Sequence, residues 1–340
     1  MLKAEPTAMT HARRGRSKAP VFVVGCGRSG TTLLYHMVLS SGNFVVYRTE
    51  SNVINLLEPR FGDLSQQRNK RRLLDAWYES RLYTLTGLDK PPLEKRVMEE
   101  CKNGGDFLRI AMEEMARMQG VERWADTTPE HILHLHRIKE TIPDALIIHI
   151  IRDGRDVALS TDKLGYIKRA PWDRSPSIMA CGLYWEWMVN KGRKDGRDLG
   201  ADYTEVHFEE LVAHPRETLD RLGEFIEHDL DYDRIQKVGI GSVSQPNSSF
   251  SDGESDGNFS PAGRWKSGYT DERLRAFEGL VGGTLAATGY ELASGEFSKL
   301  NTAGLKRMRS TYQKYFDTKL YLKAKTPLGQ FLVSRDLSWI

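Results

Sequence analysis

A glycine-rich loop near the start of the chain carries one cation and three hydroxyl groups. The loop spans residues 25–32 and directly follows an apolar run at residues 21–24. Glycines let backbone N–H groups converge on an anion, and a helix beginning after the loop adds the positive end of its dipole. We therefore expect a tetrahedral oxyanion to be bound by Gly27, Arg28, Ser29, Gly30, Thr31 and Thr32.

The loop differs in one respect from the loop that binds nucleoside triphosphates. That motif has Lys directly after its last glycine, whereas Thr31 follows Gly30 here. The cation stands inside the loop instead, at Arg28, and a guanidinium presents paired donors to phosphate or sulfate oxygens. A purely structural turn at a strand–helix junction is the alternative for this loop.

A second charged segment follows the strongest strand signal, at residues 145–151. Arg152 leaves the carboxyl end of that strand, where open α/β sheets bind ligands, and Ser160 lies two turns into the next helix. We expect Arg152 and Ser160 to bind a second phosphate far from the first. Arg155 and Asp156 are expected to form a local ion pair or helix cap, and a merely charged strand–helix connection is the alternative.

Alternating strands and helices are needed to position both segments. The apolar runs predict strands at 21–24, 44–47, 145–151 and 203–208, and helical spacing predicts helices at 33–39, 66–86, 104–119, 178–191 and 209–226. A loop or small lid is expected around Pro91 and Pro92, and a long polar loop at 241–263. This order predicts an α/β fold, a three-layer sandwich with a central parallel sheet.

Composition excludes several classes of protein. The 340 residues are 39% hydrophobic and 28% charged, and the formal net charge is only +3, which argues against a nucleic-acid-binding protein. Three cysteines cannot form a disulfide framework, so a reducing compartment, and hence the cytoplasm, is expected. No apolar run reaches the roughly 18–20 residues of a membrane span.

Both ends of the chain are basic. Residues 1–19 are expected to form a disordered basic tail, residues 20–292 the main domain, and residues 293–340 a basic, aromatic helical extension. Within that extension, residues 299–325 carry eight basic residues and one acid, a net charge of +7, with four interleaved aromatic residues. This pattern predicts peripheral association with anionic membranes, while a solvated helix face is the simpler alternative.

The two anion-binding segments together resemble the two cofactor motifs of the sulfotransferase superfamily, whose members use 3′-phosphoadenosine 5′-phosphosulfate (PAPS). The resemblance implies that residues 27–32 bind the 5′-phosphosulfate and that Arg152 and Ser160 bind the 3′-phosphate. The Arg-Ser-Gly-Thr-Thr form is closer to the tyrosylprotein, carbohydrate and bacterial branches than to the cytosolic steroid and phenol branch, which has Lys at the Arg28 position.

Further segments fit the same superfamily. Residues 124–129 resemble the Asp-Lys-Thr-Pro segment of bacterial members, and residues 209–219 resemble the strand and helix after the second motif. The resemblance covers roughly residues 20–292 and implies the P-loop-like sulfotransferase fold. It also implies a late basic motif that closes over the 3′-phosphate, formed by Arg264, Trp265 and Lys266.

The implied reaction moves a sulfuryl group from PAPS to a hydroxyl or amine acceptor by in-line displacement, close in logic to phosphoryl transfer and without a metal. Arg28 and the loop donors would stabilise the charge on the leaving oxygen. Glu50 is our candidate for the general base, because it follows the predicted strand at 44–47, and the tyrosylprotein branch has a catalytic glutamate in this region. Thr49 is the alternative equivalent, and a solvated loop carboxylate is the structural alternative.

Four histidines compete with Glu50 for the role of base. His131 and His134 lie one turn apart on the predicted helix after Pro129, a spacing that zinc also uses, but the absence of a second ligand pair argues against a metal site. The other two are His36 and His149, of which His149 lies inside an apolar strand and is expected to be a core residue.

One departure from the superfamily pattern leaves open whether this protein is an active enzyme. Thr127 stands where many relatives have Lys, and Arg123 or Lys266 are the candidates to supply the missing charge. Two other functions therefore stay open: a P-loop-like kinase or nucleotide-binding enzyme, with Asp153 as the magnesium carboxylate, and an inactive binding protein with the same fold. Nothing in the sequence names the acceptor or the oligomeric state.

Overall fold

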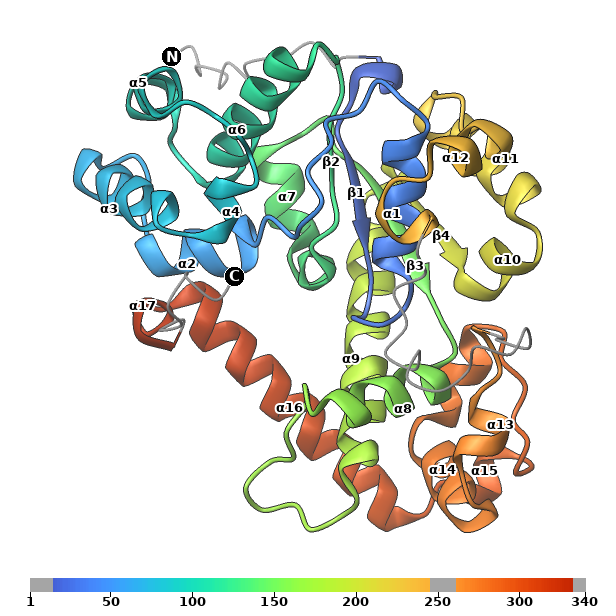
Figure 1. Ribbon diagram of the computed structural model, residues 1–340. Coiled ribbons are helices and arrows are strands. Elements are labelled where there is room, and N and C mark those ends of the chain that lie inside the picture. Colours follow the sequence, from blue (N-terminus) through green and yellow to red (C-terminus); the bar gives the residue numbers. More distant parts are fainter. Residues whose placement is uncertain (1–14, 245–260, 333–340) are drawn as a thin grey trace, which may run out of the picture.

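Four parallel strands form the centre of the molecule in the computed structural model, which describes residues 15–244 and 261–332. The strands are β1 (Val21–Val24), β2 (Ala125–Asp126), β3 (Leu146–Ile151) and β4 (Tyr203–His207), in the order β2-β1-β3-β4 (Figure 1). Strands β1 and β3 pair from Val21 with Leu146 through Val24 with His149. The chain thus moves from β1 to one neighbour and then crosses to the other, which brings different loops together at the carboxyl edge.

Helices cover both faces of this sheet, so the predicted three-layer α/β fold is confirmed. In chain order they are α1 (Thr31–Ser40), α2 (Glu58–Phe61), α3 (Gln67–Tyr78), α4 (Arg81–Thr84), α5 (Lys90–Glu100), α6 (Gly104–Gln119), α7 (Leu135–Thr141), α8 (Gly154–Leu164) and α9 (Ser177–Arg197). They continue with α10 (Phe208–Ala213), α11 (Pro215–Ile226), α12 (Tyr232–Val238), α13 (Trp265–Gly268), α14 (Asp271–Ala287), α15 (Phe297–Leu300), α16 (Ala303–Lys325) and α17 (Gly329–Leu332).

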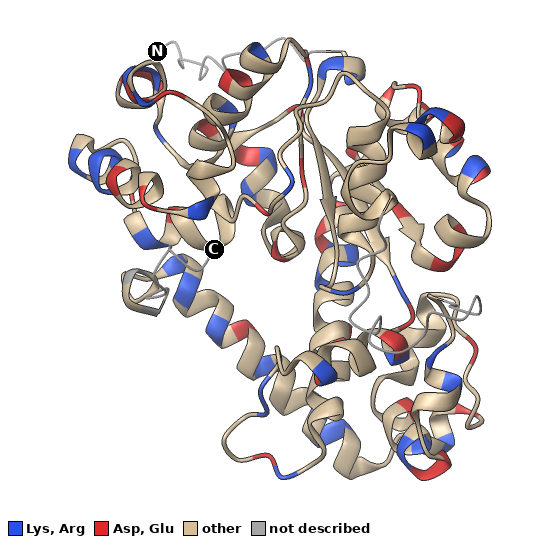
Figure 2. Ribbon diagram, viewed as in Figure 1, with Lys and Arg blue, Asp and Glu red and all other residues tan. Residues whose placement is uncertain are grey.

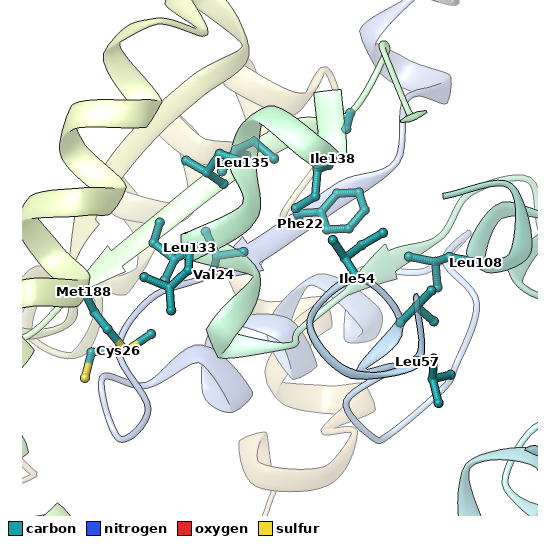
Figure 3. Packing of buried hydrophobic residues seen from close by; sticks show 14 of the residues in the cluster. Phe22, Val24, Cys26, Ile54, Leu57, Leu108, Leu133, Leu135, Ile138 and Met188 are labelled. Atoms are coloured by element: carbon teal, nitrogen blue, oxygen red, sulfur yellow. The ribbon is translucent and has the colours of Figure 1, made fainter. Parts of the chain in front are cut away.

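Alternate residues of the strands enter two separate hydrophobic clusters. Val21 and Val23 pack with α1, α11 and α12 on one face. Phe22 and Val24 pack with α6, α7 and α9 on the other face (Figure 3). Every residue of β1 and β3 is buried, as expected for parallel strands covered by helices on both sides.

Residues 44–47, predicted to be a strand, do not form one. This prediction was wrong because the segment runs beside β2 with a single bridge, between Phe44 and Arg123, and β2 itself is only two residues long. The Val45 N–H donates to the Arg123 carbonyl over 2.8 Å. The segment is therefore extended, and it still delivers the following residues to the carboxyl edge.

Three predictions of local structure also need correction. The helix predicted over 209–226 is two helices, α10 and α11, the second of which begins at Pro215. The region around Pro91 and Pro92 is not a loop, because both prolines lie in the first turn of α5, where a helix requires no N–H donor. The helix predicted over residues 66–86 is two helices, since α3 ends at Tyr78 and Ser80 caps α4 by accepting the Tyr83 N–H. The helix predicted at 104–119 matches α6.

The start of the chain differs in part from the disordered tail expected over residues 1–19, while the C-terminal region contains a long helix, as the helical extension predicted. Residues 15–19 are ordered, since Arg16 donates to the carbonyl oxygens of Phe225 and Ala201, while residues 1–14 lie outside the described part. Helix α16 packs on the domain, with Tyr312 and Phe316 buried in the same cluster as Phe22. Within residues 15–244 and 261–332, no helix combines the length and apolarity that a membrane span requires.

Candidate functional site

The loop after β1 has a positive φ at Arg28, where it is strained, and at Gly30, where only glycine fits. Arg28 has a φ of 73°, a left-handed conformation that is uncommon for a residue with a side chain. Gly30 has a φ of 96°, and a Cβ at that position would lie 2.4 Å from the Phe208 ring. Such strain persists only where the surroundings enforce it, and it is concentrated at functional sites.

The loop leads into α1 in the geometry that an anion requires. The first helical hydrogen bond runs from the Leu34 N–H to the Gly30 carbonyl over 3.1 Å, so the amides of Thr31 and Thr32 precede it at the positive end of the helix. The Ser29 hydroxyl is buried, and no hydrogen-bond partner reaches it within the described residues. A buried donor of this kind fits a site built for a ligand oxygen.

The two predicted anion motifs meet. Arg28 Nε donates to Ser160 Oγ over 3.0 Å, so a residue of the second motif contacts the arginine of the first, while the expected distance between the two phosphates stays a prediction. The physical reason is that β1 and β3 are neighbours in the sheet, which places the loop after β1 beside the start of α8. Arg28 and Ser160 therefore form one continuous surface.

Arg152 holds the loop rather than extending freely away from the strand. Its Nη1 donates to the Arg28 carbonyl over 3.0 Å and its Nη2 to the Pro261 carbonyl over 2.5 Å. The guanidinium also stacks on Phe208, 4.5 Å from the ring centroid. The Nε atom is buried and has no partner in the part of the chain that is described, so one donor stays available for a ligand.

Asp156 joins the late basic motif to the start of α8. Its carboxylate accepts the Gly263 N–H at 2.8 Å and the Trp265 N–H at 2.7 Å. Asp156 therefore does not pair with Arg155, which instead forms a local ion pair with Asp153. Residues 245–260 of the predicted long loop lie outside the described part of the chain, but its returning end is fixed by these bonds.

Three guanidinium groups lie within electrostatic reach of one another. Burial lowers the pKa of Arg152, Asp156 and Glu209 oppose this effect, and Arg28 and Arg264 add to it through repulsion. Cations are brought together against their repulsion where an anion is to be bound. Lys266 is exposed, with its Nζ 6.0 Å from the centroid of the Trp265 ring, which itself packs on Arg155.

Glu50 lies at the same edge of the sheet as the loop. The residues after it contact the end of β2: Ser51 Oγ lies 3.3 Å from Thr128 Oγ1, and the Asn52 N–H donates to the same oxygen over 3.1 Å. Solvent reaches the Glu50 side chain, yet burial by the surrounding protein, followed by repulsion from Asp126 and Glu130, raises its pKa to about 7. A carboxylate with this pKa suits a general base near neutral pH.

His131 and His134, which competed for the role of base, are poorly placed for it. They lie in a 3-10 helix, η3 (Pro129–His134), rather than an α-helix. His131 is fully buried, with Nδ1 2.8 Å from Asp126 Oδ1 while Nε2 accepts the Ile54 N–H over 3.3 Å. Burial lowers the pKa of His134 to about 3.

The two remaining histidines are structural. His149 is fully buried inside β3, where Nδ1 contacts the Tyr203 hydroxyl over 2.7 Å, as expected of a core residue. His36 Nδ1 accepts the Ser242 N–H over 2.9 Å. Residues 15–244 and 261–332 contain no cluster of three or more His, Cys, Asp or Glu residues that could hold a metal ion.

Thr127 occupies the end of β2 as a buried hydroxyl. Its side chain is buried, and no hydrogen-bond partner for Oγ1 occurs among the residues described. Arg123 cannot supply the charge of a lysine there, because it precedes β2 and donates to the Ala19 and Arg16 carbonyls at the opposite edge. Cys26 points into the core (Figure 3), and burial raises the pKa of its thiol, which excludes a reactive thiolate.

Sequence reasoning missed the residues that connect the site to distant elements. Glu130 directly follows Pro129 in a segment that the sequence had singled out, so its position was a usable signal. Nothing in the sequence indicated Asn52 and Asn55, because they lie in an irregular turn that no sequence pattern predicted. Lys323 was missed because it lies 193 residues from its partner Glu130.

Solved structures of sulfotransferases resemble this chain at low identity. The sulfotransferase domain of the Synechococcus PCC 7002 olefin synthase is 19% identical, with 73% of this chain and 86% of that chain covered and a TM-score of 0.45. Sulfotransferase STF9 from Mycobacterium avium is 14% identical, with 81% and 78% covered and a TM-score of 0.44. A retinol dehydratase solved with androsterone and the inactive cofactor PAP is 14% identical, with 92% and 83% covered and a TM-score of 0.31.

A family model gives a direct assignment. No curated protein matches the chain. The model described as the sulfotransferase family matches residues 20–232, well over half of the 340 residues, and this range includes both anion-binding motifs, Glu50 and the whole sheet. The chain therefore belongs to the sulfotransferase family.

Proposed function

We propose that this protein transfers a sulfuryl group from PAPS to a hydroxyl or amine acceptor. The observation that carries the proposal is the convergence of Arg28, Arg152 and Arg264 beside the loop after β1. The negative charges of a 5′-phosphosulfate and a 3′-phosphate would be attracted to such a cluster of cations. The buried Ser29 hydroxyl, with no partner in the described chain, and the first amides of α1 offer further donors.

Each motif would hold one end of the cofactor. The loop residues Gly27–Thr32 would bind the 5′-phosphosulfate, and Ser160 with the late motif, Arg264, Trp265 and Lys266, would bind the 3′-phosphate. Arg152 supports this site by donating from Nη1 to the Arg28 carbonyl and from Nη2 to the Pro261 carbonyl. Its Nε has no partner among the described residues and would donate to the 3′-phosphate. PAPS supplies the activated sulfuryl group, and the remaining steps belong to residues of the protein.

The side chains at this edge can assist both ends of an in-line displacement. Negative charge develops on the leaving oxygen, and Arg28 and the loop amides are pre-oriented to stabilise it. On the acceptor side, Glu50, with a pKa of about 7, is half-ionised at neutral pH and can take the acceptor proton. The Thr127 hydroxyl, at the end of β2 where many relatives have Lys, is the additional uncharged donor.

A kinase reaction finds less support. It requires a carboxylate available to magnesium, and Asp153 was the candidate after β3. Arg155 Nε lies 3.0 and 3.2 Å from the two Asp153 oxygens, and Asp153 also accepts the Arg155 N–H. The carboxylate is thus committed to an arginine and to the first turn of α8.

Thermal unfolding with nucleotides tests the proposal. We expect adenosine 3′,5′-bisphosphate to raise the Tm without magnesium, by several degrees at a concentration far above its Kd, because it binds only the folded state. ATP with magnesium is the comparison. Stabilisation by ATP and magnesium but not by the bisphosphate would overturn the proposal in favour of a kinase. A screen of labelled sulfate transfer from PAPS to steroid, sugar, lipid and peptide acceptors would then identify the acceptor class.

A further inference from the structure

Helix α16 runs across the molecule and is fixed to the long helix α9. In Figure 1 it extends from the region of α14 to the region of α2 and α17. Arg309 pairs with the fully buried Glu186 over 2.7 Å, and Trp187 Nε1 donates to Asp317 over 2.8 Å. Figure 2 shows Lys and Arg residues spaced along this helix. Its inward cations are therefore used in specific contacts rather than being a solvated face alone.

The carboxyl-terminal end of α16 reaches Glu130. Lys323 Nζ lies 3.5 Å from Glu130 Oε2, and Asn55 Nδ2 donates to the same oxygen over 3.2 Å. The Tyr184 hydroxyl of α9 also hydrogen-bonds Glu130. Burial acts to raise the pKa of Glu130, but Lys323, Asn55 and His134 outweigh it, and the pKa is lowered. Glu130 is therefore an ionised carboxylate that joins three elements.

A chain of hydrogen bonds continues from Glu130 to Glu50. Asn55 Nδ2 donates to Asn52 Oδ1 over 3.2 Å, and Asn52 Nδ2 donates to the Glu50 carbonyl over 3.4 Å. The Asn52 side chain also hydrogen-bonds the Glu50 side chain. Lys323, nearly three hundred residues away in sequence, is thereby connected to the candidate base.

The turn that carries these asparagines is irregular and needs support. Asn52 has a φ of 52°, and the Leu57 N–H donates to the Asn52 carbonyl over 3.0 Å, which closes the π-helical turn η2 (Val53–Leu57). Such turns occur mostly at functional sites, and a left-handed asparagine stores strain.

The C-terminal helices support the same turn a second time. Helix α2 continues directly from η2, and both α16 and α17 pack against α2. At Gly329 the chains approach so closely that a Cβ would lie 2.2 Å from the Lys323 carbonyl and 3.5 Å from the Pro59 carbonyl. The turn is thus held through side chains at one end and through backbone packing at the other.

We propose that Lys323 is a positioning residue that holds Glu50 in place as the base, acting through Glu130, Asn55 and Asn52. The inference rests on the proposed function, because the base role belongs to sulfuryl transfer. It assigns the C-terminal helix to the acceptor side of the site, beyond the family-matched residues 20–232.

The sign of one measurable shift separates positioning from simple electrostatics. The groups that face Glu50 are the carboxylates of Asp126 and Glu130, the His131 ring and the Asn52 amide. If the turn stays in place, loss of the distant positive charge of Lys323 leaves the Glu50 pKa unchanged or raises it. If the turn relaxes, Glu50 moves away from the surrounding protein and from the Asp126 and Glu130 carboxylates, and its pKa falls towards the ordinary 4.5.

The experiment follows Glu50 directly in the full-length chain. Glutamate labelled with ¹³C at the carboxyl carbon reports the titration by NMR, and the Glu50 signal is assigned by its loss in Glu50→Gln. We expect a pKa near 7 in the parent and in Lys323→Arg, and a fall of about one unit or more in Lys323→Met, which keeps the aliphatic stem. Lys325→Met, on the same helix but exposed, is the matched control and should leave the pKa near 7.

Other outcomes would overturn the inference. An unchanged or raised Glu50 pKa in Lys323→Met, or an equal fall in Lys325→Met, excludes positioning by Lys323. Should Lys323→Met fail to fold, Asn55→Ser cuts the same chain at its midpoint and must lower the pKa instead. Binding of adenosine 3′,5′-bisphosphate is measured in parallel, and the variants should keep the affinity of the parent. If the parent protein does not bind the bisphosphate, that result contradicts the proposed function rather than this inference.

Discussion

The loop after β1 and the segment around Glu50 leave the same edge of the sheet, but they are held by different means. The loop is fixed by residues that follow strands β3 and β4: the Arg152 guanidinium, Ser160 of α8 and the Phe208 ring. The segment around Glu50 depends on side chains contributed by η3 and by the C-terminal helix. The proposed cofactor half, around the loop, is therefore built into the sheet, while the proposed acceptor half, around Glu50, is assembled from separate elements.

This difference implies that the two halves can vary independently. The loop, Arg28 and Arg152, which we propose to bind the cofactor, lie within the family-matched region. Acceptors differ, and loops and added helices can change around a fixed sheet at little cost to the fold. A substitution around Glu50 should consequently leave the affinity for adenosine 3′,5′-bisphosphate unchanged, and a substitution in the cofactor half should leave the Glu50 pKa unchanged.

Substitution of Arg28 should have the largest effect, because it removes a guanidinium from the reacting side of the cofactor half. We expect Arg28→Ala to lower sulfuryl transfer by about 10²–10³-fold, as loss of one pre-oriented donor does. The measurement is turnover of labelled PAPS with an acceptor found in the screen. Near-parent turnover would remove Arg28 from the chemistry.

A matched variant separates charge from backbone strain at the same position. Arg28 has a φ of 73°, which glycine adopts freely, whereas alanine does not. Arg28→Gly should therefore lose transfer as fully as Arg28→Ala but retain a higher Tm. Equal melting of the two variants would show that the loop does not enforce this conformation.

Substitution of Glu50 should have the second largest effect and should be confined to the acceptor half. Since the base must be ionised, transfer should fall about tenfold for each unit of pH below the Glu50 pKa of about 7. Glu50→Gln should lower transfer by about 10²-fold or more and remove that pH dependence. Its affinity for adenosine 3′,5′-bisphosphate should stay at the parent value, and a loss of affinity would contradict the separation of the halves.

Thermal stability checks the same residue without any acceptor. The folded-state pKa of Glu50 is raised above its ordinary 4.5, so ionisation disfavours the folded state, and the penalty grows as pH rises from about 4.5 to about 7 and levels off above that. Glu50→Gln should accordingly melt at a higher temperature than the parent at pH 8, with the difference vanishing towards pH 4.5. Equal melting at pH 8 would contradict the raised pKa.

The cofactor half was largely predictable because its signals are local. Strand, glycine-rich loop and helix are consecutive, and Arg152 follows its own strand directly, so residue type and spacing identified them. What the sequence could not show is that Arg28 reaches Ser160, or that Asp156 binds the amides of Gly263 and Trp265 more than a hundred residues away. Those contacts depend on strand order, which no local pattern encodes.

The acceptor half was less predictable for the same physical reason. Glu50 was identified by its position after an apolar segment and by the resemblance to the tyrosylprotein branch. That segment is not a regular strand, because β2 is too short to pair with it fully. The charge pattern of residues 299–325 indicated a helix but not its inward partners Glu186 and Glu130. Binding of this helix to anionic membranes through its outward-facing cations stays a prediction.

The smallest effect is expected at Asp156, which stabilises the cofactor half without touching the reaction. Asp156→Asn removes a carboxylate that accepts two N–H groups, so the late motif with Arg264 and Lys266 should close less firmly. We expect affinity for adenosine 3′,5′-bisphosphate to fall about tenfold, equivalent to about 1.4 kcal/mol, by isothermal titration. The Glu50 pKa, measured by NMR in the same variant, should stay near 7, since Asp156 is not among the groups that shift it. A parallel change in both quantities would show that the two halves move together, whereas a loss of affinity alone confirms that the late motif serves the cofactor only.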